Sequence, residues 1–113
     1  MHEFSMAVEV ISLAEREADK AMAKIILEIT IEVGDLSGIE ADAFEMALGL
    51  LVKDSILEKA IINIKRIPGK AKCNSCNYVF EMNQRMATCP KCEAFPSEVS
   101  GGNEFRVLSL VVE

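Results

Sequence analysis

The sequence has few aromatic residues and a single histidine. It contains no tryptophan, one tyrosine and five phenylalanines among 113 residues, although half of its residues are apolar. The core must therefore be built from aliphatic side chains and methionine, which at this length give modest stability unless a metal or crosslink adds to it. With one histidine, no Ser-His-Asp set and no glycine-rich phosphate-binding loop, the chain lacks the residues of common catalytic sites. We therefore expect a binding protein and not an enzyme.

Long apolar runs and basic runs are also absent. No stretch approaches the roughly 20 apolar residues that span a bilayer, and an N-terminus carrying Glu3 and Glu9 does not resemble a signal peptide. We therefore expect a soluble cytoplasmic protein without a membrane partner. The net charge is −6, and the acidic excess lies in residues 1–67, whereas residues 68–113 are balanced. Because nucleic-acid-binding proteins usually carry a basic patch, we do not expect a nucleic acid as partner.

Apolar spacing predicts two helices and three strands. Residues 4–22 and 40–53 have helical spacing, while residues 25–33, 60–67 and 104–113 are rich in β-branched residues and predict strands. On the first helix, the expected buried stripe consists of Phe4, Ala7, Val8, Ile11, Ala14, Ala18 and Met22. On the first strand, the expected buried face carries Ile25, Leu27, Ile29, Ile31 and Val33.

The order of these elements predicts an α+β fold with two helices packed on a small three-stranded sheet. Every cysteine lies in residues 70–100, between the last two strands. We therefore expect one α+β domain made of residues 1–69 plus 101–113. We expect residues 70–100 to form an inserted zinc-ribbon-like module.

The four cysteines follow the pattern C-x2-C-x12-C-x2-C, with pairs Cys73/Cys76 and Cys89/Cys92. Each CxxC can form a tight turn that directs two sulfurs to one point, and two such turns complete a tetrahedral S4 site that suits Zn(II). Two disulfides, a redox-active CxxC and an iron–sulfur cluster are alternatives, although cytosolic thiols stay reduced and a redox site needs only one motif. Four protein ligands leave no position for water, so a zinc ion here would be structural.

The single histidine is the second residue, in MHE. One interpretation is an ordinary exposed side chain. In the other, the Met1 amine, the His2 amide nitrogen and the His2 Nδ1 chelate one metal ion, and the Glu3 amide nitrogen provides a fourth donor. Four planar nitrogens, two of them deprotonated amides, favour Ni(II) or Cu(II) over Zn(II) or Mg(II).

Four segments occur in this order along the chain: MHE at the start, VGDLSGIE at residues 33–40, the two CxxC pairs, and SGGNEFRVLSLVVE at residues 100–113. Together they resemble the HypA/HybF family of nickel-delivery metallochaperones. The resemblance covers essentially the whole chain in the same order. It implies a protein that delivers Ni(II) for maturation of [NiFe]-hydrogenase and in some organisms of urease.

The resemblance also implies sites and partners. It assigns nickel to Met1, His2 and Glu3, and a structural zinc to the four cysteines Cys73, Cys76, Cys89 and Cys92. The implied partners are the hydrogenase-maturation GTPase HypB, the hydrogenase large subunit and, where urease is served, urease maturation factors; the chain is expected as a monomer or homodimer. Two departures stand out. Glu93 replaces a glycine that is common in relatives, so this turn is expected to differ slightly, and the zinc module contains no histidine that could reach nickel.

Two other functions fit parts of the pattern. A zinc-ribbon module that binds nucleic acid or a transcription complex is the leading alternative, although the acidic balance and scarcity of aromatic residues count against it. A dithiol oxidoreductase is the weaker one, since it requires a thiol pair that remains titratable when metal is bound.

Overall fold

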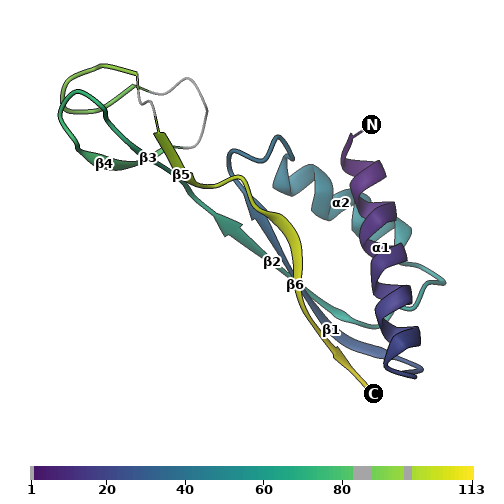
Figure 1. Ribbon diagram of the computed structural model, residues 1–113. Coiled ribbons are helices and arrows are strands. Elements are labelled where there is room, and N and C mark those ends of the chain that lie inside the picture. Colours follow the sequence, from purple (N-terminus) through teal and green to yellow (C-terminus); the bar gives the residue numbers. More distant parts are fainter. Residues whose placement is uncertain (1, 83–87, 96–97) are drawn as a thin grey trace.

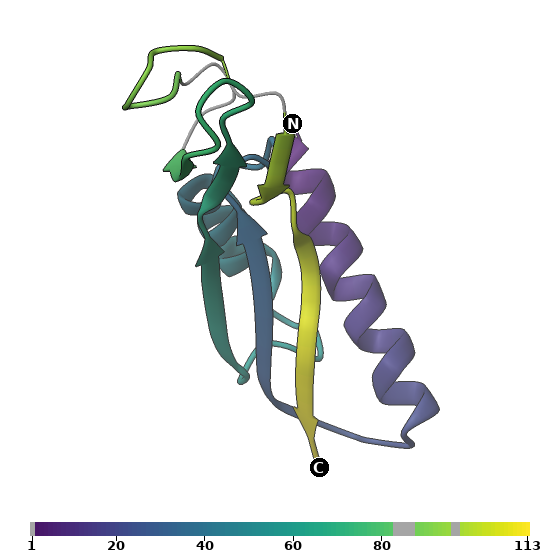
Figure 2. The same cartoon turned by 60° about the vertical axis from the view of Figure 1, so that its left-hand side comes forward.

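The computed structural model describes residues 2–82, 88–95 and 98–113. Along the chain lie α1 (His2–Lys20), β1 (Ile26–Gly34), α2 (Ala41–Leu51), β2 (Ile61–Ile67), β3 (Gly69–Lys72), β4 (Val79–Met82), β5 (Glu98–Gly101) and β6 (Phe105–Val112). Two helices cover one face of a sheet, and a smaller sheet extends from one end of it, giving an elongated molecule of 54 × 26 × 17 Å (Figure 1 and Figure 2). Within the described residues, no helix is both long and apolar enough to cross a membrane.

The first sheet has the strand order β2-β1-β6. β1 and β2 run parallel and are connected through α2, while β6 pairs antiparallel with the other side of β1. The predicted α+β fold, with two helices on a three-stranded sheet, is confirmed. Its core is aliphatic apart from Phe44, whose ring meets that of Phe105 edge-on at 5.1 Å.

The first helix is shifted relative to its prediction. It spans residues 2–20 instead of 4–22, and Met22 lies beyond its end at φ 56°, with 90% of the side chain exposed. Ala7, Ala14 and Ala18 are buried as expected, but Val8 is 51% exposed and Val10 is buried in its place. The buried face is thus rotated away from Val8, because the helix contacts both the sheet and α2.

The first strand changes phase near its start. Ile29, Ile31 and Val33 are buried as predicted, whereas Leu27 is 40% exposed and Ile26 is fully buried. The pairing with β6 shifts register between Ile26 and Glu28, so that one extra residue interrupts the alternation. A bulge of this kind moves the preceding side chains to the opposite face, which makes the expected burial of Leu27 wrong.

The second sheet has the order β4-β3-β5, with antiparallel pairing on both sides of β3. It has a separate small core, formed by Leu36, Ala71, Cys73, Phe80, Met82 and Cys89. Leu36 comes from the loop that follows β1, so the first part of the chain contributes to this core.

Three glycines lie where the two sheets meet. A Cβ on Gly34 would lie 2.1 Å from the Gly102 carbonyl oxygen, and a Cβ on Gly102 would lie 2.5 Å from the Gly69 Cα. Gly102 has φ +100°, and the Leu36 N–H donates to its carbonyl at 2.7 Å. We call Gly34, Gly69 and Gly102 the glycine junction; here backbone packs directly on backbone, which only glycine permits.

Candidate metal centre

The four cysteines meet at one point beside the second sheet, in the turns outside its strands. All four sulfurs lie within 4.8 Å of one another; the Cys73–Cys92 distance is 3.3 Å and the Cys76–Cys89 distance is 3.7 Å. A tetrahedral ion with metal–sulfur bonds of 2.3 Å requires sulfur–sulfur distances of about 3.8 Å. All four are free thiols. The predicted convergence of the two CxxC pairs is therefore observed, and the donor set fits a thiophilic d-block ion such as zinc.

The two CxxC turns repeat the same backbone pattern. In the first, the Asn77 N–H donates to the Cys73 carbonyl at 2.9 Å; in the second, the Glu93 N–H donates to the Cys89 carbonyl at 2.8 Å. Asn77 and Glu93 have φ of 62° and 64°, so each closes its turn in the left-handed region. The expectation that Glu93 would alter its turn is therefore not met, because Glu93 adopts the same left-handed conformation as Asn77.

Backbone N–H groups favour the thiolate form of the cysteines, which is the form that binds a cation. The Cys76 N–H donates to the Cys73 sulfur and is the main reason that the Cys73 pKa falls from 9.0 to about 6. Although the Ala94 N–H favours the Cys92 thiolate, the adjacent Cys73 sulfur and burial raise the pKa of Cys92 to about 12. The cluster can therefore become fully ionised only with a positive charge among the sulfurs, which a divalent metal ion supplies.

Two of the four cysteines are buried and two are exposed. Cys73 and Cys89 are fully buried in the small core, while Cys76 and Cys92 are exposed. Close to the cysteines in sequence, the Lys91 ammonium lies 4.7 Å from the centre of the Tyr78 ring. With four sulfurs around one point, the arrangement is that of a closed, structural metal site.

Of the predicted nickel ligands, His2 and Glu3 lie at the start of α1, in a different part of the molecule from the four cysteines. Met1 is outside the described residues; His2 is the first residue of the helix and is exposed. The Glu3 carboxylate accepts a hydrogen bond from the Glu40 N–H at 3.3 Å, and thus connects this end of α1 to the start of α2. Nothing in the sequence indicates this contact between residues 37 positions apart. Figure 1 shows the start of α1 well separated from the four-cysteine module.

Comparison with known proteins identifies the family of the chain. The family model described as HypA, hydrogenase/urease nickel incorporation, metallochaperone, matches residues 1–112. The chain belongs to the HypA family. The predicted resemblance is confirmed, and this family is one of metallochaperones and maturation factors.

Relatives within the HypA family match along their whole length. The hydrogenase maturation factors HypA of Parabacteroides distasonis and Geobacter metallireducens are 38% and 37% identical to this chain over 113 residues, which is 98% and 100% of their lengths. The solution structure of the Ni metallochaperone HypA from Helicobacter pylori has a TM-score of 0.65 at 28% identity, covering 97% of this chain and 96% of that one.

Proposed function

We propose that this HypA-family protein binds Ni(II) at its amino terminus and delivers it for maturation of [NiFe]-hydrogenase, while the four cysteines hold a structural zinc ion. The family match over residues 1–112 is the main support for this proposal. Urease is named beside hydrogenase in the family's description, and we include it in the proposal as a second recipient of the nickel.

The proposed nickel ligands are the Met1 amine, the His2 imidazole and the backbone amides of His2 and Glu3. The first N–H groups of a helix have no partner within that helix, so the amide nitrogens of His2 and Glu3 are not needed by the hydrogen-bond ladder of α1. His2 is exposed, so its ring can turn toward the terminus. The Glu3 carboxylate, which accepts from Glu40, serves to hold the terminus in place and not as a ligand.

Zinc is our assignment for the four-cysteine site. A thiolate set with tetrahedral spacing is typical of structural zinc, and binding of the ion contributes directly to folding of small modules. In line with this role, we propose that residues 70–100 form a separate module inserted into a domain of residues 1–69 plus 101–113.

We propose that the acidic first part of the chain attracts metal cations and basic partners. Residues 1–67 hold the whole net charge of −6, which favours the approach of cations and of basic partner surfaces. We propose the maturation GTPase HypB and the hydrogenase large subunit as partners, in the cytoplasm.

A Ni(II) titration that varies only the terminus tests the nickel site. Native protein should bind one Ni(II) tightly by calorimetry, and both His2→Ala and a short Gly-Ser extension before Met1 should abolish tight binding. The extension is the sharper test because it leaves His2 intact and removes only the free amine. Glu3→Gln should weaken binding less, since the ligand is the backbone nitrogen. Equal affinities of native and extended protein would place nickel elsewhere.

The zinc assignment has its own test. Metal analysis of untagged protein should find about one zinc per chain. Cys73→Ala should lose that zinc, while α1 and β1 persist because their core does not include the cysteines. Iron absorption bands, or no metal at all, would contradict zinc without affecting the nickel proposal.

A further inference from the structure

α2 is apolar on more than its buried side. Its sequence, ADAFEMALGLL, contains only two charged residues. One face, which includes Phe44 and Leu48, is buried in the core of the first sheet. Met46 and Leu50 lie outside that face and are 70% and 66% exposed. Because a helix that is apolar all round is normally covered all round, the described residues leave one apolar face of α2 uncovered.

The exposed apolar residues have the spacing of a helix–helix contact. Ala43, Met46 and Leu50 follow one another at intervals of three and four residues, and all three are exposed. This spacing lines up side chains along a helix and is the spacing with which two helices pack side by side. The flexible side chain of methionine adapts to the surface it meets. We call Ala43, Met46 and Leu50 the α2 stripe. It fits a second helix and not an added strand, which needs a free sheet edge.

The surroundings of the α2 stripe are acidic. α1 and α2 together carry seven acidic residues and two basic ones, and both basic residues lie in the second half of α1. Beside the stripe, Glu45 is exposed and directly precedes Met46, while Asp42 already pairs with Arg66. A helix that packs on the stripe is therefore favoured if it carries basic residues beside its apolar side.

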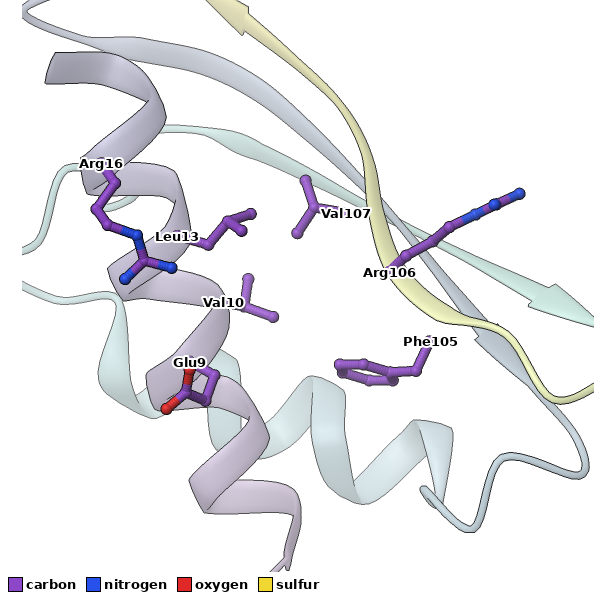
Figure 3. Close-up of a pocket in the computed structure, with 7 residues that line it drawn as sticks. All are labelled: Glu9, Val10, Leu13, Arg16, Phe105, Arg106 and Val107. Carbon is purple, nitrogen blue, oxygen red and sulfur yellow. The ribbon is translucent and has the colours of Figure 1, made fainter. Parts of the chain in front are cut away.

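The apolar cavity between α1 and β6 has a different charge pattern. It has a volume of about 340 Å³, and Figure 3 shows Val10 and Leu13 of α1 facing the β6 strand across it. Glu9 and Arg16 both line it from the α1 side, so its rim carries charges of both signs. Such a rim does not select a partner of one charge, whereas the α2 stripe does.

The α2 stripe begins close to the amino terminus of the chain. The Glu40 N–H donates to the Glu3 carboxylate, and Ala43 follows Glu40 by three residues. The stripe therefore starts about one helical turn from the contact that joins α2 to the first turn of α1. A helix docked on the stripe lies beside the end of α1 where we place nickel.

We propose that the α2 stripe binds an amphipathic helix of a partner protein. The apolar side of that helix packs on Ala43, Met46 and Leu50, and its basic residues face Glu45. This inference rests on the proposed function in one respect, because we assign the helix to a protein that exchanges nickel with the amino terminus. Docking on α2 holds that protein next to His2 while leaving the ligands of the site unobstructed by the contact.

Binding of the two proposed partners tests the surface. The probes are purified HypB GTPase and hydrogenase large subunit of the same organism, measured by biolayer interferometry on zinc-loaded, full-length protein. Met46→Lys and Leu50→Lys should each raise the dissociation constant for at least one probe by about tenfold or more, because a positive charge enters the apolar contact and faces a basic helix.

Ile61→Lys is the matched control. Ile61 is 63% exposed on β2, and its neighbour Ile62 packs on the core, so Ile61 points to the face of the sheet away from the helices. This variant loses an exposed apolar side chain of similar size and should bind both probes with native affinity. Circular dichroism and zinc content verify that each variant is folded.

Charge changes at Glu45 test the basic character of the partner helix. Glu45→Lys should weaken binding several-fold and Glu45→Gln should weaken it less, since the first repels a basic helix and the second only removes an attraction. Affinity of the native protein should also fall as salt is added. If Glu45→Lys bound more tightly than native protein, the partner surface would be acidic and the proposal would be overturned.

Two measurements separate this surface from the nickel proposal. Met46→Lys should bind Ni(II) as native protein does in calorimetry, because the substitution leaves the proposed nickel ligands unchanged. Probe binding that ignores Met46→Lys and Leu50→Lys would overturn the docking surface and leave the nickel site standing. Probe binding that these variants weaken, in a protein that binds no nickel, would support the surface and contradict the nickel site. A native protein that binds neither probe would overturn both the proposed partners and the docking surface.

Discussion

Glu93 closes the second CxxC turn in a backbone conformation that glycine adopts more easily. Its φ is 64°, and the equivalent residue of the first turn, Asn77, has φ 62°. A residue with a Cβ in the left-handed region costs roughly 1–2 kcal/mol, and asparagine tolerates it better than glutamate. The second turn therefore stores more backbone strain than the first.

Glu93→Gly should relieve this strain and stabilise the metal-bound module by about 1 kcal/mol. The change should appear as slower transfer of zinc to a chromogenic chelator, with the zinc content unchanged. Asn77→Gly is the matched control and should have a smaller effect. If Glu93→Gly accelerated zinc loss, the Glu93 side chain would have a stabilising role that its backbone conformation does not indicate.

Zinc retention should depend on pH in a way set by the sulfurs. All four must be thiolates to bind the ion, so protons compete with zinc and affinity falls as pH falls. Since the Cys73 pKa is about 6 and not 9.0, this thiol is already ionised at neutral pH and must be deprotonated only below about pH 6. Zinc occupancy against a competing chelator should therefore decline more steeply below about pH 6 than above it. A uniform slope through this range would contradict the lowered pKa.

The residues of the metal site were predictable because CxxC spacing specifies its own local geometry. Two ligands three residues apart can converge through their own turn, and both pairs bring their sulfurs together as expected. The left-handed conformation of Glu93 was not predictable from residue type, since the turn imposes it against the preference of glutamate.

At the scale of secondary structure, α2 begins with a hydrogen-bond network that includes Glu3 of α1. The Glu40 carboxylate accepts from the N–H groups of Asp42 and Ala43 at 3.3 and 2.6 Å, while the Glu40 N–H itself donates to Glu3. One residue thus caps α2 with its side chain and anchors α1 with its backbone.

Glu40→Ala should lower the free energy of unfolding by about 1 kcal/mol, because two helix N–H groups lose their acceptor. Chemical denaturation measures this, and Glu40→Asp should keep most of the stability because aspartate is a good N-cap. The backbone contact to Glu3 survives both substitutions, so nickel affinity should be unaffected. A loss of nickel binding in Glu40→Ala would show that its carboxylate, and not only its backbone, supports the terminus.

The long elements were predictable and the short ones were not. Both helices and the three strands of the first sheet have enough residues for an apolar period to emerge, and each was found within a few positions. β3, β4 and β5 have four residues each, too few to establish alternation. The burial of Ile26 in place of Leu27 depends on the register with β6, which is a property of two strands and not of either sequence alone.

At the scale of the whole molecule, the contact between the two sheets depends on the glycine junction. Gly102→Ala should be strongly destabilising, because its φ is +100° and its Cβ would lie 2.5 Å from the Gly69 backbone. We expect a loss of about 2 kcal/mol or more in the free energy of unfolding. Gly49→Ala is the control: nothing lies within 4 Å of that Cβ, and alanine in a helix should instead stabilise by about 0.5–1 kcal/mol. Equal stability of native protein and Gly102→Ala would mean that the backbone at the junction moves apart for the added methyl group without any loss of stability.

Because backbone atoms form this junction, each half of the molecule can be exchanged for the equivalent half of a relative. Their relative orientation rests mainly on three residues without side chains and on the hydrogen bonds around Gly102, so the outer surfaces of either half can be replaced without changing how they join. A four-cysteine module from a distant relative should therefore fit this chain if Leu36 and the three glycines are kept. The partner specificities of the two ends could then be combined in new pairs within one chain.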